Sequence, residues 1–127
     1  MAHRSAPPAT AAERDQRPLD IDVMRACARR LLAEDAELPT PDELETLTLQ
    51  LRGHINLLMP EVEQVASRLP YDDIPRYCAL ACIGEARKKL SLEPSPGLHG
   101  GIAFARRLSR VVHALCDHLE NLGGGHA

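Results

Sequence analysis

Residues 38–69 read LPTPDELETLTLQLRGHINLLMPEVEQVASRL, and this stretch decides the fold class. Its apolar side chains recur about every 3.6 residues over about seven turns, which keeps one face of a helix apolar throughout. The pattern predicts one long helix of the kind that packs in a bundle. The apolar positions are Leu44, Leu47, Leu51, Ile55, Leu58, Val62, Val65 and Leu69.

The start of this helix is marked by Thr40, Pro41 and Glu43. The Thr40 hydroxyl can accept from the amide three residues later, and the Glu43 carboxylate can reach back to the Thr40 amide, which together make a capping box. Pro41 falls at the first helical position, where its missing N–H costs nothing. The helix is therefore predicted to begin at residue 41.

Pro60 lies inside the apolar pattern and cannot donate a hydrogen bond to the carbonyl of Asn56. One possible outcome is a break into two helices. The apolar spacing, however, continues across Pro60 without a change of phase. We therefore expect a kink in one continuous helix rather than a hairpin.

Three further helices are predicted from apolar stripes at helical spacing, over about residues 19–38, 73–90 and 102–122. The proline- and glycine-rich segment 91–101 is expected to be a loop. No alternating strand pattern occurs, and the connections are short. The sequence thus predicts an all-α fold, an antiparallel four-helix bundle whose second helix is long and kinked at Pro60.

The third predicted helix differs from the others because its centre, YCALACIGEA at residues 77–86, is apolar nearly all round. Asp72 or Asp73 is expected to cap its first turn. A helix without a polar face is typical of packing on more than one side. Small residues in this segment also allow close approach of a neighbouring helix.

Composition limits the classes of function. The chain has 127 residues and a net charge of -3, with no Trp, one Phe and two Tyr, which argues against modules that stack bases on aromatic rings. No apolar run is long enough for a membrane span or a signal peptide, so we expect a soluble, cytoplasmic protein without membrane contact. We predict one domain over 19–122, after a disordered arm at 1–18 and before a flexible tail at 123–127.

No group of residues has the spacing of a known reactive motif. The sequence therefore predicts no catalytic residue, no metal site and no cofactor. The cysteines are expected to be reduced thiols that pack as small apolar side chains. A thiolate metal site inside the bundle remains an alternative. The four cysteines are Cys27, Cys78, Cys82 and Cys116.

The last predicted helix carries two groups of polar side chains, one of Cys, His and Asp and one of basic residues. A nucleophilic triad could be made of Cys116, His113 and Asp117. Adjacent residues on a helix do not face each other, however, which disfavours this assignment. The basic side chains Arg106, Arg107 and Arg110, beside His113, could receive a phosphate, an acidic ligand or DNA. This cluster is small and the net charge is acidic, so we do not expect nucleic acid as a partner.

If a ligand pocket exists, we expect it at the Pro60 kink, where a disrupted helix opens space. The polar side chains that could line it are Arg52, His54, Asn56 and Glu61. His54 and Glu61 lie seven residues apart on the same side of the helix. They could also act as acid–base groups in an apolar cavity.

Several apolar side chains lie away from the principal stripe of their helix or, for Phe104 and Val111, at the edge of that stripe. Either the bundle covers them more completely, or they form a second interface. We expect a homodimer in which one helix pair packs across a two-fold axis, because closed dimers are the commonest oligomers. These side chains are Leu49, Leu57, Met59, Phe104 and Val111.

A family resemblance is carried by three segments, LRGHINLLMPEVEQ (51–64), YCALACIGEARKKL (77–90) and ARRLSRVVHALCDHLENL (105–122). The chain resembles small, uncharacterised, helical actinobacterial proteins, Streptomyces-like in source, that are found beside natural-product biosynthesis clusters. The resemblance covers about residues 44–122. It implies an accessory role in secondary metabolism and names no catalytic residue.

Together these observations favour a non-catalytic accessory or regulatory protein that binds a partner protein or a small metabolite between its helices. One alternative is a small helical enzyme of the cyclase or isomerase type that uses His54 and Glu61. A second alternative is a DNA-associated transcriptional regulator that uses the arginines of the last helix.

Overall fold

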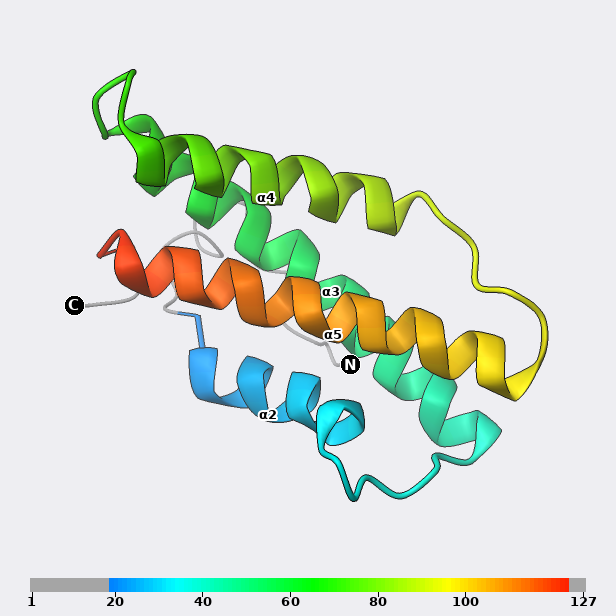
Figure 1. The fold of residues 1–127 in the computed structure, drawn as a ribbon. Helices are drawn as coiled ribbons and strands as arrows, with labels where there is room; N and C mark the ends of the chain where they lie inside the picture. Colours follow the sequence, from blue (N-terminus) through cyan, green and yellow to red (C-terminus); the bar gives the residue numbers. More distant parts are fainter. Residues whose placement is uncertain (1–18, 124–127) are drawn as a thin grey trace, which may run out of the picture.

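The computed structural model describes residues 19–123, and within that range helices joined by loops form the fold, with no strand (Figure 1). The predicted arm at 1–18 and residues 124–127 of the predicted tail lie outside the described residues. None of the helices in the described range is long and apolar enough to cross a membrane. The helices are α2 (Ile21–Leu32), α3 (Pro41–Ser67), α4 (Ile74–Leu90) and α5 (Gly97–Asn121).

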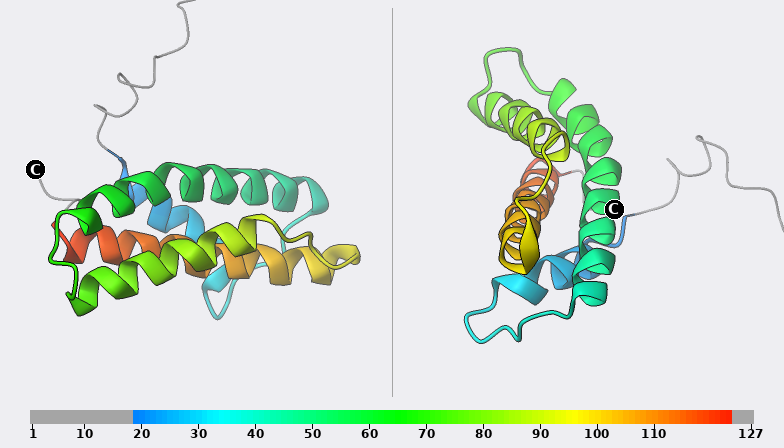
Figure 2. Two further views of the ribbon diagram at one scale, coloured as in Figure 1. Left: turned by 90° about the horizontal axis from the view of Figure 1, so that it is seen from above. Right: turned by 90° about the vertical axis from the view of Figure 1, so that its right-hand side faces the viewer.

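The predicted four-helix bundle is confirmed. Helix α5 lies between α2 and α4, and α3 runs behind these three helices (Figures 1 and 2). Consecutive helices point in opposite directions. The most extensive contact joins α3 and α5, whereas α2 and α4 do not touch each other. The α3–α5 pair is thus the centre of the fold, with one shorter helix packed on each side.

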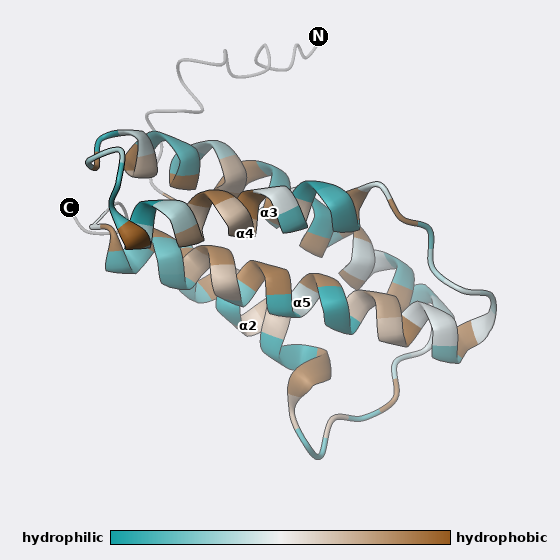
Figure 3. Cartoon of the chain, turned by 45° about the horizontal axis from the view of Figure 1, so that its top comes forward, coloured by the Kyte–Doolittle hydropathy of each residue, from teal (hydrophilic) through white to brown (hydrophobic). Residues whose placement is uncertain are grey.

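The core follows the apolar stripe of α3. Leu51, Ile55, Leu58 and Val62 are fully buried. Figure 3 shows hydrophobic segments recurring along every helix, as expected when each turns one face inward. The facing stripe of α5 completes the core with Ile102, Phe104, Ala105, Leu108, Val112, Leu115, Cys116 and Leu119.

One half of the predicted capping box forms, and the other half does not. The backbone N–H of Glu43 donates to the Thr40 hydroxyl at 3.1 Å, as predicted. The Glu43 carboxylate instead accepts two hydrogen bonds from the Arg30 guanidinium of α2, both at 3.1 Å. A charged, bidentate donor from a neighbouring helix is stronger than a backbone amide, which explains the exchange. The pair also ties the end of α2 to the start of α3.

Helix α3 continues through Pro60 without a break, as the unbroken apolar period predicts. Pro60 and Asn56 are both exposed. Water can therefore hydrogen-bond to the Asn56 carbonyl that Pro60 leaves without an N–H donor, and the helix tolerates the proline.

Two predicted helix ends are wrong. Helix α2 ends at Leu32 rather than near Pro39, because residues 33–35 and Leu38 are exposed and the apolar stripe of the helix does not continue through them. Helix α5 begins at Gly97, five residues before the predicted start.

The early start of α5 depends on its glycines, which allow close packing rather than breaking the helix. A Cβ on Gly100 would lie 2.2 Å from the Ser95 carbonyl oxygen, and one on Gly101 would lie 2.8 Å from Leu44 Cδ2. Gly97 has a φ of +85°, a conformation that favours glycine. These residues bring the first turns of α5 against both the preceding loop and α3.

Candidate ligand pocket

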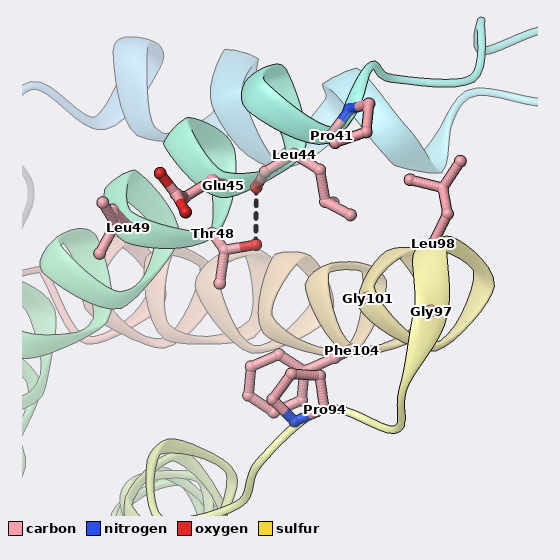
Figure 4. A pocket seen from close by; sticks show the side chains of 10 residues that line it. All are labelled: Pro41, Leu44, Glu45, Thr48, Leu49, Pro94, Gly97, Leu98, Gly101 and Phe104. Carbon is pink, nitrogen blue, oxygen red and sulfur yellow. Dashed lines mark hydrogen bonds between the residues drawn. The ribbon is translucent and has the colours of Figure 1, made fainter.

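A cavity of about 370 Å³ opens where the first turns of α3 and α5 meet (Figure 4). The loop that precedes α5 forms its third side. The lining residues are Pro41, Leu44, Glu45, Thr48 and Leu49 of α3, Pro94 of the loop, and Gly97, Leu98, Gly101 and Phe104 of α5.

The lining is almost wholly apolar. Only Glu45 and Thr48 carry polar side chains, and Glu45 is exposed to solvent. The Thr48 hydroxyl donates to the Leu44 carbonyl at 2.8 Å, as the dashed line in Figure 4 shows, so its proton is not free for a ligand. No histidine, cysteine or lysine is among the lining residues. The pocket is therefore suited to holding an apolar group.

Arg52 holds one wall of the pocket in place from outside. Its guanidinium lies 5.0 Å from the centre of the Phe104 ring, and its Nη1 donates to the Leu90 carbonyl at 3.0 Å. The first contact is a cation–π interaction, and the second binds a backbone oxygen in the last turn of α4. Arg52 thus links α3, α4 and α5 beside the pocket. The side chain was predicted to bind ligand, and its observed contacts are within the protein.

The four predicted ligand residues do not converge on one cavity. Arg52 and Asn56 lie on one flank of the buried stripe of α3, whereas His54 and Glu61 lie on the opposite flank, because positions four or seven residues apart share a side of a helix. None of the four lines the cavity between α3 and α5. Asn56 is exposed, and the others are half-buried.

His54 has an unusual environment even so. Its Nδ1 is buried and has no hydrogen-bond partner within residues 19–123. Burial lowers the pKa of His54, so the neutral imidazole is favoured. No hydrogen bond or ion pair joins His54 to Glu61 in the described part of the chain.

Sequence reasoning missed the pocket because it assigned residues 91–101 to a loop. Half of the cavity is built from the loop's Pro94 and from the glycine-rich first turn of α5. The sequence signal for this site is Phe104, the single phenylalanine, which lies at the edge of the apolar stripe of its helix.

The model of one protein family, described as "Family of unknown function (DUF6415)", matches residues 22–124. The chain belongs to the DUF6415 family. The match spans all four helices and so extends beyond the segments that first suggested a family. The DUF6415 description names no activity, source organism or biosynthetic role. Searches of curated proteins and of solved structures gave no match.

The cysteines of this DUF6415 chain are spread over the bundle. Cys27 belongs to α2 and Cys78 and Cys82 to α4, and these two helices do not touch. No three His, Cys, Asp or Glu side chains within residues 19–123 are grouped as metal ligands. Cys116 is fully buried, and burial raises the pKa of its thiol to about 11. A protonated, enclosed thiol is a core side chain rather than a nucleophile.

His113 and Asp117 of the DUF6415 chain interact with α2 instead of with Cys116. Arg25 of α2 donates to the Asp117 carboxylate at 2.8 Å and also to the Glu120 carboxylate. Its Nη1 lies 3.4 Å from His113 Nδ1. Burial lowers the pKa of His113, and the positive charge of Arg25 lowers it further. This cluster joins α2 to α5 and explains why a short helix packs stably at the edge.

The basic cluster predicted on the last helix is divided between two sides of α5. Arg106 donates to the Leu31 carbonyl of α2 at 3.1 Å. Arg107 and Arg110 face α4, where they line a second cavity of about 400 Å³ together with Lys89 and Glu85. The arginines therefore do not form one continuous patch for a phosphate backbone.

Proposed function

We propose that this DUF6415 protein is a non-catalytic binding protein that takes a small, mainly apolar molecule between α3 and α5. The observation that carries the proposal is the cavity of about 370 Å³ whose lining has no free hydrogen-bond donor other than backbone groups. Its volume lies at the lower end of the range of small-molecule sites, about 300–1,000 Å³.

Two further features support binding of a small molecule over contact with a partner protein's surface. The site is concave, and its Phe104 wall is held by Arg52 before any ligand arrives. A preformed apolar cavity binds without the cost of ordering its own side chains. The accessory role in secondary metabolism stays a proposal that rests on the family resemblance.

An acid–base enzyme that uses His54 and Glu61 has less support. Neither residue lines the apolar cavity, and the two are not joined by a hydrogen bond within the described residues. An acid–base pair must reach the proton it transfers, which requires a substrate site next to both groups.

The proposal is tested by titration with N-phenyl-1-naphthylamine, a neutral apolar fluorophore. The wild-type protein should give a saturable increase in fluorescence with one binding site per chain. The double variant Leu49→Gln/Leu98→Gln places polar groups at two partly exposed lining positions without disturbing the core. We expect it to bind about tenfold more weakly, because apolar contact area is lost.

Leu57→Gln is the matched control. Leu57 is an exposed leucine two turns after Leu49 on the same helix, and it does not line the cavity. This variant should bind the probe as the wild type does. Equal affinity in the double variant, or no saturable binding to the wild type, would show that the cavity is not the site.

We also propose that the chain forms a homodimer. Of the five apolar side chains that suggested a second interface, Phe104 is buried and Met59 and Val111 pack against the core. Only Leu49 and Leu57 remain exposed, and Leu49 belongs to the pocket. The interface is therefore better sought on another helix, and α4 exposes the bulky side chains Ile74 and Tyr77.

A further inference from the structure

Helix α4 packs with only one of its sides. Its fully buried residues are Ala79, Ile83 and Ala86, which face α3 and α5. The centre of this helix, residues 77–86, is nevertheless apolar nearly all round, which is typical of a helix covered on more than one side. Within the described chain nothing covers its outer side.

The outer side of α4 carries a second regular stripe. Its members are Ile74, Tyr77, Ala81, Gly84 and Lys88, spaced alternately by three and four residues, as in a helix that pairs with another. Ile74 is 73% exposed and Tyr77 is 74% exposed, among the largest exposures of apolar side chains in the structure. A Cβ on Gly84 would meet nothing within 4 Å, so the protein's own packing does not require a glycine there.

Charges at the two ends of α4 are complementary. Asp72 lies just before the helix, and Lys88 lies in its last turn. Neither has an ion-pair partner within residues 19–123. A second α4 laid antiparallel would bring Asp72 of each chain beside Lys88 of the other. The same orientation also pairs opposite ends of the two helix dipoles.

We propose that the outer face of α4 is the interface of a homodimer, in which two α4 helices cross antiparallel near Ala81. The stripe is self-complementary about Ala81, because Tyr77 lies one turn before it and Gly84 lies one turn after it. An antiparallel copy places Tyr77 of one chain against Gly84 of the other, which lets the two helices approach closely. A second copy is favoured over another partner because Asp72 and Lys88 of the same chain supply both members of each charge pair. The inference rests on the proposal that the chain self-associates and is independent of the apolar pocket.

Sedimentation equilibrium of the full chain over a range of concentrations tests the interface. The wild type should be dimeric, and Ala81→Arg should be monomeric, since it places two like charges at the crossing point. Asp72→Lys and Lys88→Glu should each weaken the dimer about tenfold or more. The double variant Asp72→Lys/Lys88→Glu restores opposite charges and should recover the dimer. Circular dichroism of each variant verifies that the bundle is folded.

Leu57→Gln removes an exposed leucine on α3 and is expected to leave the dimer unchanged. A monomeric wild type would overturn both self-association and this interface. If the Ala81→Arg variant remains dimeric, the α4 interface would be wrong and the chains would associate through another surface. Failure of the charge exchange to restore association would contradict the antiparallel arrangement.

Discussion

Individual residues of this bundle differ sharply in environment even when they share a side-chain type. Cys78 is exposed, Cys27 and Cys82 are half-buried, and Cys116 is enclosed in the core. Burial raises the pKa of Cys27, Cys82 and Cys116, most clearly for Cys116. Reactivity toward alkylating agents requires both access and a thiolate.

We therefore predict that iodoacetamide modifies Cys78 of the folded protein at least about tenfold faster than Cys116. Mass spectrometry of peptides at successive times gives the two rates. In denaturant the difference should disappear. Equal rates in the native protein would contradict the buried position of Cys116.

His54 makes stability depend on pH. Burial lowers its pKa in the folded protein, so the unfolded chain binds the proton more readily. The contribution of His54 to the free energy of unfolding is present above the pKa of the unfolded chain, about 6.5, and is lost as the pH falls through the pKa of the folded protein. His113 acts in the same direction, because burial and then Arg25 lower its pKa.

The free energy of unfolding, measured with urea, should consequently be lower at pH 5.5 than at pH 7.5. In His54→Gln this difference should shrink, since one of the two buried imidazoles is absent. An unchanged difference in the variant would show that His54 is solvated in the folded state.

At the scale of the helices, glycines act in two opposite ways. Gly53 lies in the middle of α3, where a Cβ would meet nothing within 4 Å. Gly100 lies in the first turns of α5, where a Cβ would lie 2.2 Å from the Ser95 carbonyl oxygen. The first glycine weakens its helix, whereas the second makes the packing of its helix possible.

Alanine substitutions should separate these roles. Gly53→Ala should raise the free energy of unfolding by about 0.5–1 kcal/mol, because alanine is the better helix former. Gly100→Ala should lower it by about 1–3 kcal/mol, through crowding against the loop. Urea denaturation of both variants checks the prediction, and a stabilising Gly100→Ala would mean that the loop does not pack as described.

The elements also show what sequence patterns can and cannot predict. The stripe of α3 and the Thr40 cap were readable because they depend on local spacing and on one side chain near the backbone. The early start of α5 could not be predicted from the sequence, since glycines normally indicate a loop. Only contact with Leu44 and Ser95 explains their helical placement. The second role of Glu43 likewise depends on Arg30 from another helix.

For the whole molecule, the fold depends on local sequence spacing, whereas the site depends on contacts between distant segments. The four-helix bundle follows from apolar periodicity, which each helix carries in its own sequence. The predicted site at Pro60 assumed that a proline opens space, but the helix continues and its polar residues point to two flanks. The observed pocket arises from the meeting of two helix starts and a loop, which no single segment encodes.

A methyl NMR titration shows most directly whether an apolar molecule binds between α3 and α5. The protein, with isotope-labelled leucine and isoleucine methyl groups, is titrated with N-phenyl-1-naphthylamine. Saturable shifts should be largest for the lining residues Leu44, Leu49 and Leu98, with little change at Ile83 of α4, which does not line the cavity. Shifts centred on α4, or the absence of any saturable shift, would contradict binding between α3 and α5.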